Sequence, residues 1–239
     1  MADLWAFIPG FVQGAGVTMM TGVMSIVMML VVGLLLALAC RAPSKWLPGT
    51  AAFVIEVLRA NSAIVLLFWV YYAVPLLPGN YKPGGLAAAV IVLGINGGAY
   101  AAEIIRGAAN SVPRGQYDAC QALGIGFWRR EFRIVLPQSL AIAMPSLSGM
   151  SVELFKWSAV VSLVGVQELL HWGEVARQQT GRTVAIYVFL MVAYYLFGRL
   201  IMIAFNVAGN ALASPGMKTS SQSHDGSVAD VGLPVYINR

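Results

Sequence analysis

Ionisable side chains inside apolar segments are the first feature of this sequence that could do chemistry. Glu153 and Lys156 stand three residues apart in an otherwise apolar stretch, so on a helix they share one face and can pair. An ionisable group inside a membrane costs at least ~2.5 kcal/mol on insertion scales and normally faces a cavity or a partner. The two residues are therefore either a structural ion pair or part of a polar pathway where a zwitterionic solute finds both signs of charge.

Neutral polar side chains in the apolar segments are further pathway candidates, because each offers hydrogen bonds where lipid offers none. They are Asn61, Asn96, Tyr100, Ser158 and Ser162. Each of them could equally join two helices. Glu103 and Arg106 also have the spacing of an ion pair, and we expect them to anchor a helix near the membrane surface.

The sequence gives no support for a catalytic site. Its two histidines and scattered carboxylates provide neither a ligand cluster nor a nucleophile beside a base, and no phosphate-binding G-x-x-x-x-G-K-[ST] motif occurs. Cys40 and Cys120 have no metal-like spacing, and we expect them to be packing residues. We therefore predict a protein that is not an enzyme and binds no metal or cofactor itself.

The elements that position these residues are predicted to be transmembrane helices. The 239 residues are 59% hydrophobic and 10% charged, whereas soluble domains have about 25% charged residues. Crossing a bilayer takes about 20 apolar residues. We predict an all-α integral membrane domain over residues 1–213 and a polar tail over 214–239. The expected spans are 16–40, 60–78, 85–105, 138–157 and 183–205.

Charge placement predicts how the chain crosses the membrane. With five spans, Lys82, Arg177 and Arg182 fall on one side and most of the other Lys and Arg residues on the opposite side. Because positive residues are retained in the cytoplasm, the N-terminus should be external and the C-terminus and tail cytoplasmic. The apolar residues 157–170 are too few to cross again as a straight helix, so we expect a broken or re-entrant segment.

A charged cytoplasmic loop, residues 107–137, interrupts the apolar sequence between the third and fourth spans. Its residues 116–123 are compatible with a short helix that Gly124 and Gly126 end, followed by a second helix. Several apolar side chains of this loop have no lipid to cover them, so we expect a protein partner to cover them. These are Ala119, Cys120, Leu123, Ile125 and Phe127.

The loop resembles the EAA loop of binding-protein-dependent ABC importer permeases, which reads Glu-Ala-Ala-x3-Gly-x9-Ile-x-Leu-Pro. The matching residues, at the same spacing, are Asp118, Ala119, Cys120, Gly124, Ile134, Leu136 and Pro137. Residues 96–124 and 156–170 are similar to segments of the polar amino acid subfamily, and about residues 15–210 follow the family pattern. The resemblance implies the type I ABC importer permease fold in a bacterial cytoplasmic membrane.

The same resemblance implies a mechanism and partners. Two permease subunits, identical or paralogous, form the pathway, two ATPase subunits bind ATP and Mg, and an external solute-binding protein delivers the cargo. The helix around Asp118 to Gly124 would seat in the ATPase, and a polar amino acid or a related zwitterion would be the cargo. Nucleic acid is not an expected partner.

The positions that differ from the family pattern affect the expected identity of the cargo more than the expected docking of the loop. Asp118 stands where the family has Glu and Cys120 where it has Ala, and both changes are small. Arg59 to Ser62 replaces the subfamily's R-G-T-P, and Trp157 replaces its Asp. The alternatives are an ion-gradient-driven secondary transporter, which five spans without a repeat disfavour, and a membrane-embedded enzyme.

Overall fold

The computed structural model describes residues 7–78 and 82–212, and every regular element in these ranges is helical. The predicted tail, 214–239, lies outside the described residues. The elements are α2 (Ile8–Arg41), α3 (Leu47–Ala60), α4 (Ala63–Phe68), η1 (Trp69–Ala73), η2 (Val74–Leu76), α5 (Gly85–Asn110), α6 (Arg114–Ala122), α7 (Phe127–Arg130), η3 (Glu131–Val135), α8 (Leu136–Trp157), η4 (Ser158–Val164), α9 (Leu169–Thr180) and α10 (Thr183–Leu212).

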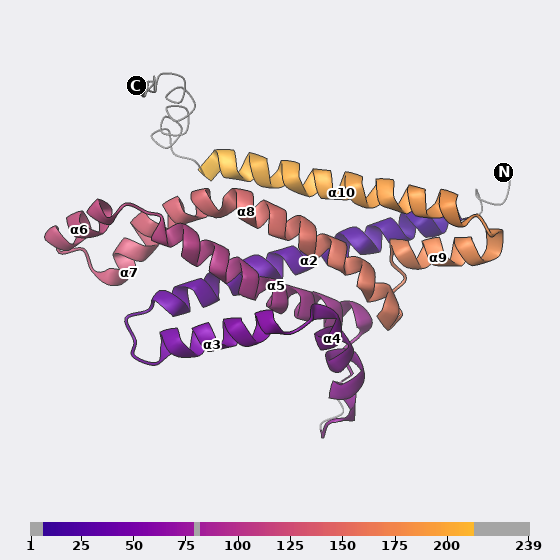
Figure 1. Ribbon diagram of the computed structural model, residues 1–239, viewed down its shortest axis with the longest axis horizontal. Helices are drawn as coiled ribbons and strands as arrows, with labels where there is room; N and C mark the ends of the chain where they lie inside the picture. Colours follow the sequence, from indigo (N-terminus) through magenta and orange to yellow (C-terminus); the bar gives the residue numbers. More distant parts are fainter. Residues whose placement is uncertain (1–6, 79–81, 213–239) are drawn as a thin grey trace, which may run out of the picture.

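The long helices α2, α5, α8 and α10 run beside one another in an elongated bundle (Figure 1). Small residues let α2 and α5 approach closely. A Cβ atom on Gly98 would lie 2.6 Å from Cγ1 of Val32, and one on Gly33 would lie 2.6 Å from Cβ of Ala101. Neither site has room for a larger side chain, which is how small residues act between membrane helices.

The predicted span 60–78 is not one straight helix. Residues before it form α3, which packs against α2 and α5, and the direction of the chain changes by 95° between Leu47–Ala60 and Ala63–Leu76. Asn61 has the extended conformation (φ −96°, ψ 146°) and donates from Nδ2 to the carbonyl of Val57 at 2.7 Å. The Asn61 side chain thus satisfies a carbonyl at the end of α3, and the break falls at the predicted start of the span.

Four helices of the described chain are long and apolar enough to cross a membrane, and the bent pair would make a fifth span. The first of them begins at Ile8, eight residues before the predicted span 16–40. The third, Phe127–Val164, continues past Trp157, where the predicted span 138–157 ends, through η4 to Val164.

Residues 158–168 leave α8 without crossing the bundle again. The 3₁₀ helix η4 ends at Gly165, which has φ +79°, and the chain then turns into α9 at the same end of the bundle as the start of α2 (Figure 1). The helices α6 and α7 lie at the opposite end. Because α2 begins and α10 ends at opposite ends of the bundle, the path fits an odd number of crossings.

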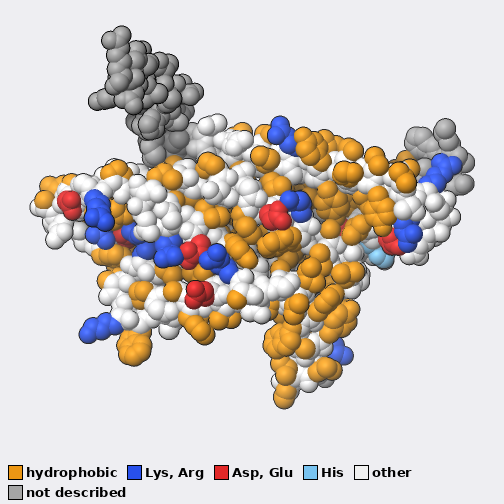
Figure 2. All heavy atoms as spheres, viewed as in Figure 1, with side chains coloured by type: hydrophobic (Ala, Val, Ile, Leu, Met, Phe, Trp, Pro, Cys, Tyr) orange, Lys and Arg blue, Asp and Glu red, His pale blue; other side chains and the backbone are white. Residues whose placement is uncertain are grey.

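The surface divides by residue type. Hydrophobic side chains cover much of α10 and the projecting segment α4, whereas many charged side chains gather over the α6–α7 end and α3 (Figure 2). On α10, Met191, Val192 and Tyr195 are all exposed. A long helix with such a face suits contact with lipid rather than water.

Candidate functional site

The charged loop folds as a helix, a tight turn and a second helix. The first helix, α6, ends at Ala122, Gly124 just beyond it has φ +67°, and the amide of Ile125 donates to the carbonyl of Cys120 at 2.9 Å. A positive φ and a hydrogen bond from beyond the glycine are typical of a helix C-terminus. The helix starts at Arg114, two residues before the predicted start.

The far end of α6 is an exposed knob, which we define as residues 118–124. Asp118, Ala119 and Gly124 are exposed, and 76% of Leu123 is exposed to solvent. Cys120 is buried, so the prediction that it is exposed was wrong. The reason is helical periodicity, which turns Cys120 towards the body of the protein while its neighbours point outward.

The remaining predicted loop residues lie further from the knob. Phe127, Ile134 and Leu136 are half-buried, and Pro137 is exposed at the start of α8. Pro at this position is favourable because the first helical N–H groups need no partner in the helix. These residues form the connection between the knob and α8.

A buried ion pair joins this connection to the end of α2. Glu131 is 2% exposed and accepts from Nε of Arg41 at 2.8 Å and from Nη2 at 3.1 Å. Nη2 also lies 3.0 Å from Oη of Tyr117 on α6, and this hydroxyl donates to the carbonyl of Ala109 on α5 at 3.1 Å. Arg41 and Tyr117 thus connect the ends of α2 and α5 to the loop.

Two further contacts hold α6 in place. The side-chain amides of Gln116 and Gln138 donate to each other at 3.0 and 2.6 Å, which joins α6 to α8. The guanidinium of Arg130 lies 5.2 Å from the ring centre of Tyr117 and 5.1 Å from that of Phe127. The knob is therefore connected to the ends of three long helices, α2, α5 and α8.

The sequence analysis did not predict the ion pair of Arg41 and Glu131, which connects the loop to α2. Arg41 and Glu131 are 90 residues apart, and nothing in their local sequence indicates that they meet. The only indication of an ion pair was Glu131 itself, because it is an acidic residue within a run of basic and apolar residues.

The polar pathway candidates of α5 support the end of α3. Asn96 is 1% exposed and donates to the carbonyl of Leu58 at 2.7 Å, and Tyr100 donates to the carbonyl of Arg59 at 3.3 Å. The guanidinium of Arg59 lies 5.3 Å from the ring centre of Tyr100. Asn61, at the break itself, is exposed. These three candidates are therefore brought together around the α3–α4 break.

Glu153 and Lys156 form the predicted ion pair, with 2.6 Å between Oε2 and Nζ. Both side chains are about half exposed (48% and 55%), so the other residues described in this chain do not bury the pair. The ring of the next residue, Trp157, packs edge-on against Tyr100 at 6.3 Å. The pair thus lies on the open surface of the chain, beside the α3–α4 break.

Ser158 and Ser162 make only local hydrogen bonds. Their hydroxyls donate to the carbonyls of Phe155 and Ala159, at 2.7 and 3.0 Å, and Ser158 is buried. Ser158 therefore has no open surface at which a solute could contact it in this chain.

Glu168 is a buried polar residue that sequence reasoning did not single out. It is 1% exposed, accepts from Oη of Tyr194 at 2.7 Å and from the amide of His171 at 3.0 Å, and lies 3.1 Å from Oγ1 of Thr18. It caps α9 and joins it to α2 and α10. The missed signal was an acidic residue directly before the segment that forms α9.

On the same helix, the ion pair of Glu174 and Arg177 is exposed. The hydrogen bonds from Arg177 and then Gln178 lower the pKa of Glu174 from 4.5 to about 2. A lowered carboxylate pKa stabilises the fold above pH 4.5, and this contribution is lost as the pH falls towards 2. The pair therefore stays ionised in mildly acidic surroundings.

The described residues contain no group of three His, Cys, Asp or Glu side chains that could hold a metal ion. Cys40 and Cys120 are both free thiols. Glu103 and Arg106 form their predicted pair at 2.7 Å near the end of α5.

Comparison with known proteins identifies the relatives of the chain. It is 33% identical over 172 residues to the glutamine transport system permease protein GlnP of Escherichia coli (strain K12), a match that covers 72% of this chain and 78% of GlnP. It is 30% identical over 187 residues to the probable amino-acid ABC transporter permease protein YckA of Bacillus subtilis (strain 168), covering 78% and 82%.

Solved structures share the fold. A crystal structure of an amino acid ABC transporter with histidines superposes with a TM-score of 0.78 at 24% identity, covering 88% of this chain and 97% of the other. The methionine ABC transporter MetNI in an inward-facing conformation gives a TM-score of 0.67 at 21% identity, covering 88% and 98%. These matches confirm the predicted type I ABC importer permease fold.

A family model also matches residues 29–214, which include the C-terminal part of α2, the helices α5, α8 and α10, and the loop with the residues that connect it to them. The chain belongs to the family of binding-protein-dependent transport system inner membrane components.

Proposed function

We propose that this chain is the membrane-spanning subunit of an ATP-driven importer for a polar amino acid or a similar zwitterionic solute. It forms half of the translocation pathway and couples to a separate ATPase through residues 118–137. The observation that carries the proposal is an exposed knob, residues 118–124, that buried and half-buried side chains connect to the ends of three long helices.

The anchored knob suits the transmission of force. A partner that moves the knob also moves the ends of α2, α5 and α8, because Glu131, Tyr117 and Gln138 connect them without an intervening flexible segment. Leu123, at 76% exposure, is a large apolar side chain that no described residue of this chain covers, which is typical of a surface that a partner covers. We infer that it enters a groove of the ATPase, which binds ATP and Mg.

The other partners follow from the family. We propose two ATPase subunits, a second permease subunit that is identical or paralogous, and an external solute-binding protein. The charge distribution supports a cytoplasmic α6–α7 end and an external α9 in a bacterial cytoplasmic membrane, with the N-terminus outside and the C-terminus inside.

The pair of Glu153 and Lys156 is the proposed contact with the cargo. The two half-exposed charges lie in the membrane domain, where a cavity or a partner must surround them. A cavity shared with the second permease would present both charges to a zwitterion. Two relatives support this class of cargo, because the name of YckA refers to amino acids and the name of GlnP refers to glutamine.

The test uses the permease reconstituted in liposomes with its ATPase and binding protein. We expect Asp118→Lys and Leu123→Glu to reduce ATP-driven uptake roughly tenfold or more, since loss of an interface anchor commonly costs about 2 kcal/mol. The permease should remain folded, because both side chains are exposed. Lys45→Glu, a charge reversal outside the loop, is the control and should leave uptake unchanged. Normal uptake by both loop variants would refute the docking role.

The same liposomes distinguish a secondary transporter. The proposal requires ATP, the ATPase and the binding protein for uptake. Uptake by the permease alone, driven by an ion gradient, would support the alternative.

A further inference from the structure

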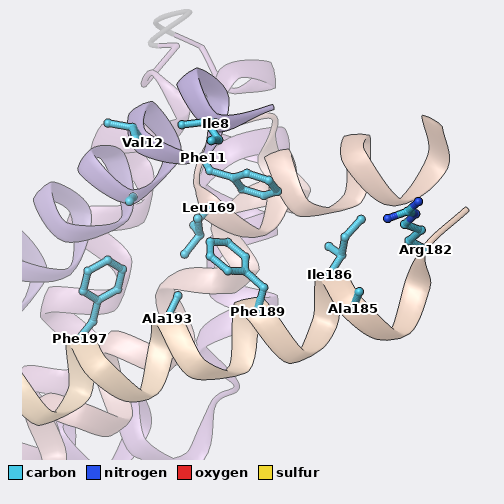
Figure 3. A pocket seen from close by; sticks show the side chains of 11 residues that line it. Ile8, Phe11, Val12, Leu169, Arg182, Ala185, Ile186, Phe189, Ala193 and Phe197 are labelled. Atoms are coloured by element: carbon cyan, nitrogen blue, oxygen red, sulfur yellow. The ribbon is translucent and has the colours of Figure 1, made fainter. Parts of the chain in front are cut away.

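An apolar groove of about 680 Å³ lies between α2, α9 and α10, at the end of the bundle opposite the knob (Figure 3). Phe11 of α2 packs against Phe189 of α10, with 5.0 Å between the ring centres, and Leu169 of α9 lies beside them, so these side chains form the floor of the groove. A single cation, Arg182, is the only charged residue among the described residues that line the groove. Its volume falls in the range of about 300 to 1,000 Å³ that is usual for small-molecule sites.

The residues of α10 that line the groove form a row along the helix. Ile186, Phe189, Ala193 and Phe197 follow Arg182 at intervals of three or four residues, which places them on one face of the helix. From residue 182 to residue 197 the helix rises roughly 22 Å. The groove therefore has a cation at the end of the bundle and an apolar floor that extends into the membrane.

Arg182 is available to bind an anion. Its side chain is exposed and makes no ion pair with any described residue, in contrast to Arg177, which pairs with Glu174 on α9. The N-terminus of α10 lies beside it at Thr183 and adds the positive end of a helix dipole. An anion at this point lies at the surface of the membrane.

We infer that this groove binds one phospholipid, with an acyl chain along Phe189 and Ala193 and the phosphate at Arg182. A phospholipid has the same order of groups, an anion at the membrane surface and an apolar chain below it. The site is independent of the proposed cargo.

The test counts the phospholipids that the purified importer retains. The complex is taken from nanodiscs of phosphatidylglycerol and phosphatidylethanolamine into mild detergent, and native mass spectrometry measures the lipid bound per permease. We expect one retained phospholipid per permease in the unaltered protein. Ala193→Phe should remove it by filling the groove. Val192→Phe is the matched control, because Val192 is exposed and does not line the groove, and it should retain the lipid.

Arg182→Gln tests the phosphate contact. A basic residue near the membrane surface contributes enough to lower the affinity about fivefold when it is removed, so phosphatidylglycerol retention should fall by about that factor. If Ala193→Phe fails to assemble, Ala185→Phe fills the groove nearer its mouth, with Val184→Phe as its control.

Two results would overturn the inference. One is equal lipid retention by the groove-filling variants and their controls. The other is efficient disulfide cross-linking of a cysteine at position 193 to a second permease, since the groove would then be a protein interface.

Discussion

At the scale of single residues, the importance of a charge depends on its burial. Glu131 and Glu103 each pair with one arginine of a long helix, yet Glu131 is 2% exposed and Glu103 29%. A buried pair that loses one partner leaves the other charge without compensation, whereas an exposed pair contributes little. Substitution of each carboxylate in turn therefore compares the loss of a buried ion pair with the loss of an exposed one in the same protein.

We predict that Glu131→Gln lowers the free energy of unfolding by about 2 kcal/mol, because Arg41 loses a charged hydrogen-bond acceptor in a largely buried site. Thermal or denaturant unfolding of the purified permease in detergent measures the loss. Glu103→Gln is the control and should change stability by no more than about 0.5 kcal/mol. The same stability for both variants would mean that the Arg41–Glu131 pair is not an anchor.

At the scale of elements, α9 is a short helix whose position depends on one buried side chain. Glu168 caps it and contacts Thr18 of α2 and Tyr194 of α10. The rest of the helix packs through a few apolar residues, among them Leu169 and Ala176. Such an element can open locally without unfolding the bundle.

We predict that Glu168→Ala lowers the free energy of local opening of α9 by about 3 kcal/mol, because a buried acceptor with several donors is lost. Hydrogen exchange of the amides of residues 171–180 measures this change. Glu174→Ala removes an exposed carboxylate from the same helix and should have a much smaller effect. Unchanged exchange in the Glu168 variant would contradict the capping role.

At the scale of the whole molecule, the segment from α4 to η2 projects from the bundle (Figure 1). Its exposed side chains are apolar on several sides, and they include Val65 (62%), Trp69 (55%) and Tyr72 (56%). A helix that is apolar all round is normally buried. A second permease is the partner that the proposed function provides for this segment.

We therefore predict that Val65→Ser combined with Trp69→Ser lowers the yield of complexes with two permeases at least fivefold, since two interface anchors are truncated. The ratio of permease to ATPase in the purified importer measures it. Val188→Ser combined with Val192→Ser alters the exposed face of α10 to the same extent and serves as the control. Equal yields would show that the projecting segment faces lipid.

The sequence by itself determined the class of the protein. Long apolar runs require helices in a bilayer, because each helix satisfies its own backbone hydrogen bonds, and the spacing from Asp118 to Pro137 is sufficient to indicate the family. The short helix ending at Gly124 and the ion pairs of Glu153 and Glu103 were also predictable, since they depend only on neighbours along the chain.

Only the tertiary structure decided how these parts are held. The contact of Arg41 with Glu131, the contacts of Glu168 with Thr18 and Tyr194, and the groove below Arg182 all join residues from distant parts of the chain. The 95° change of direction at Asn61 also depends on packing, because the sequence predicts that a span starts there but not its angle to the preceding helix. Local patterns determine which segments become helices, whereas burial and charge pairing between helices depend on packing in three dimensions.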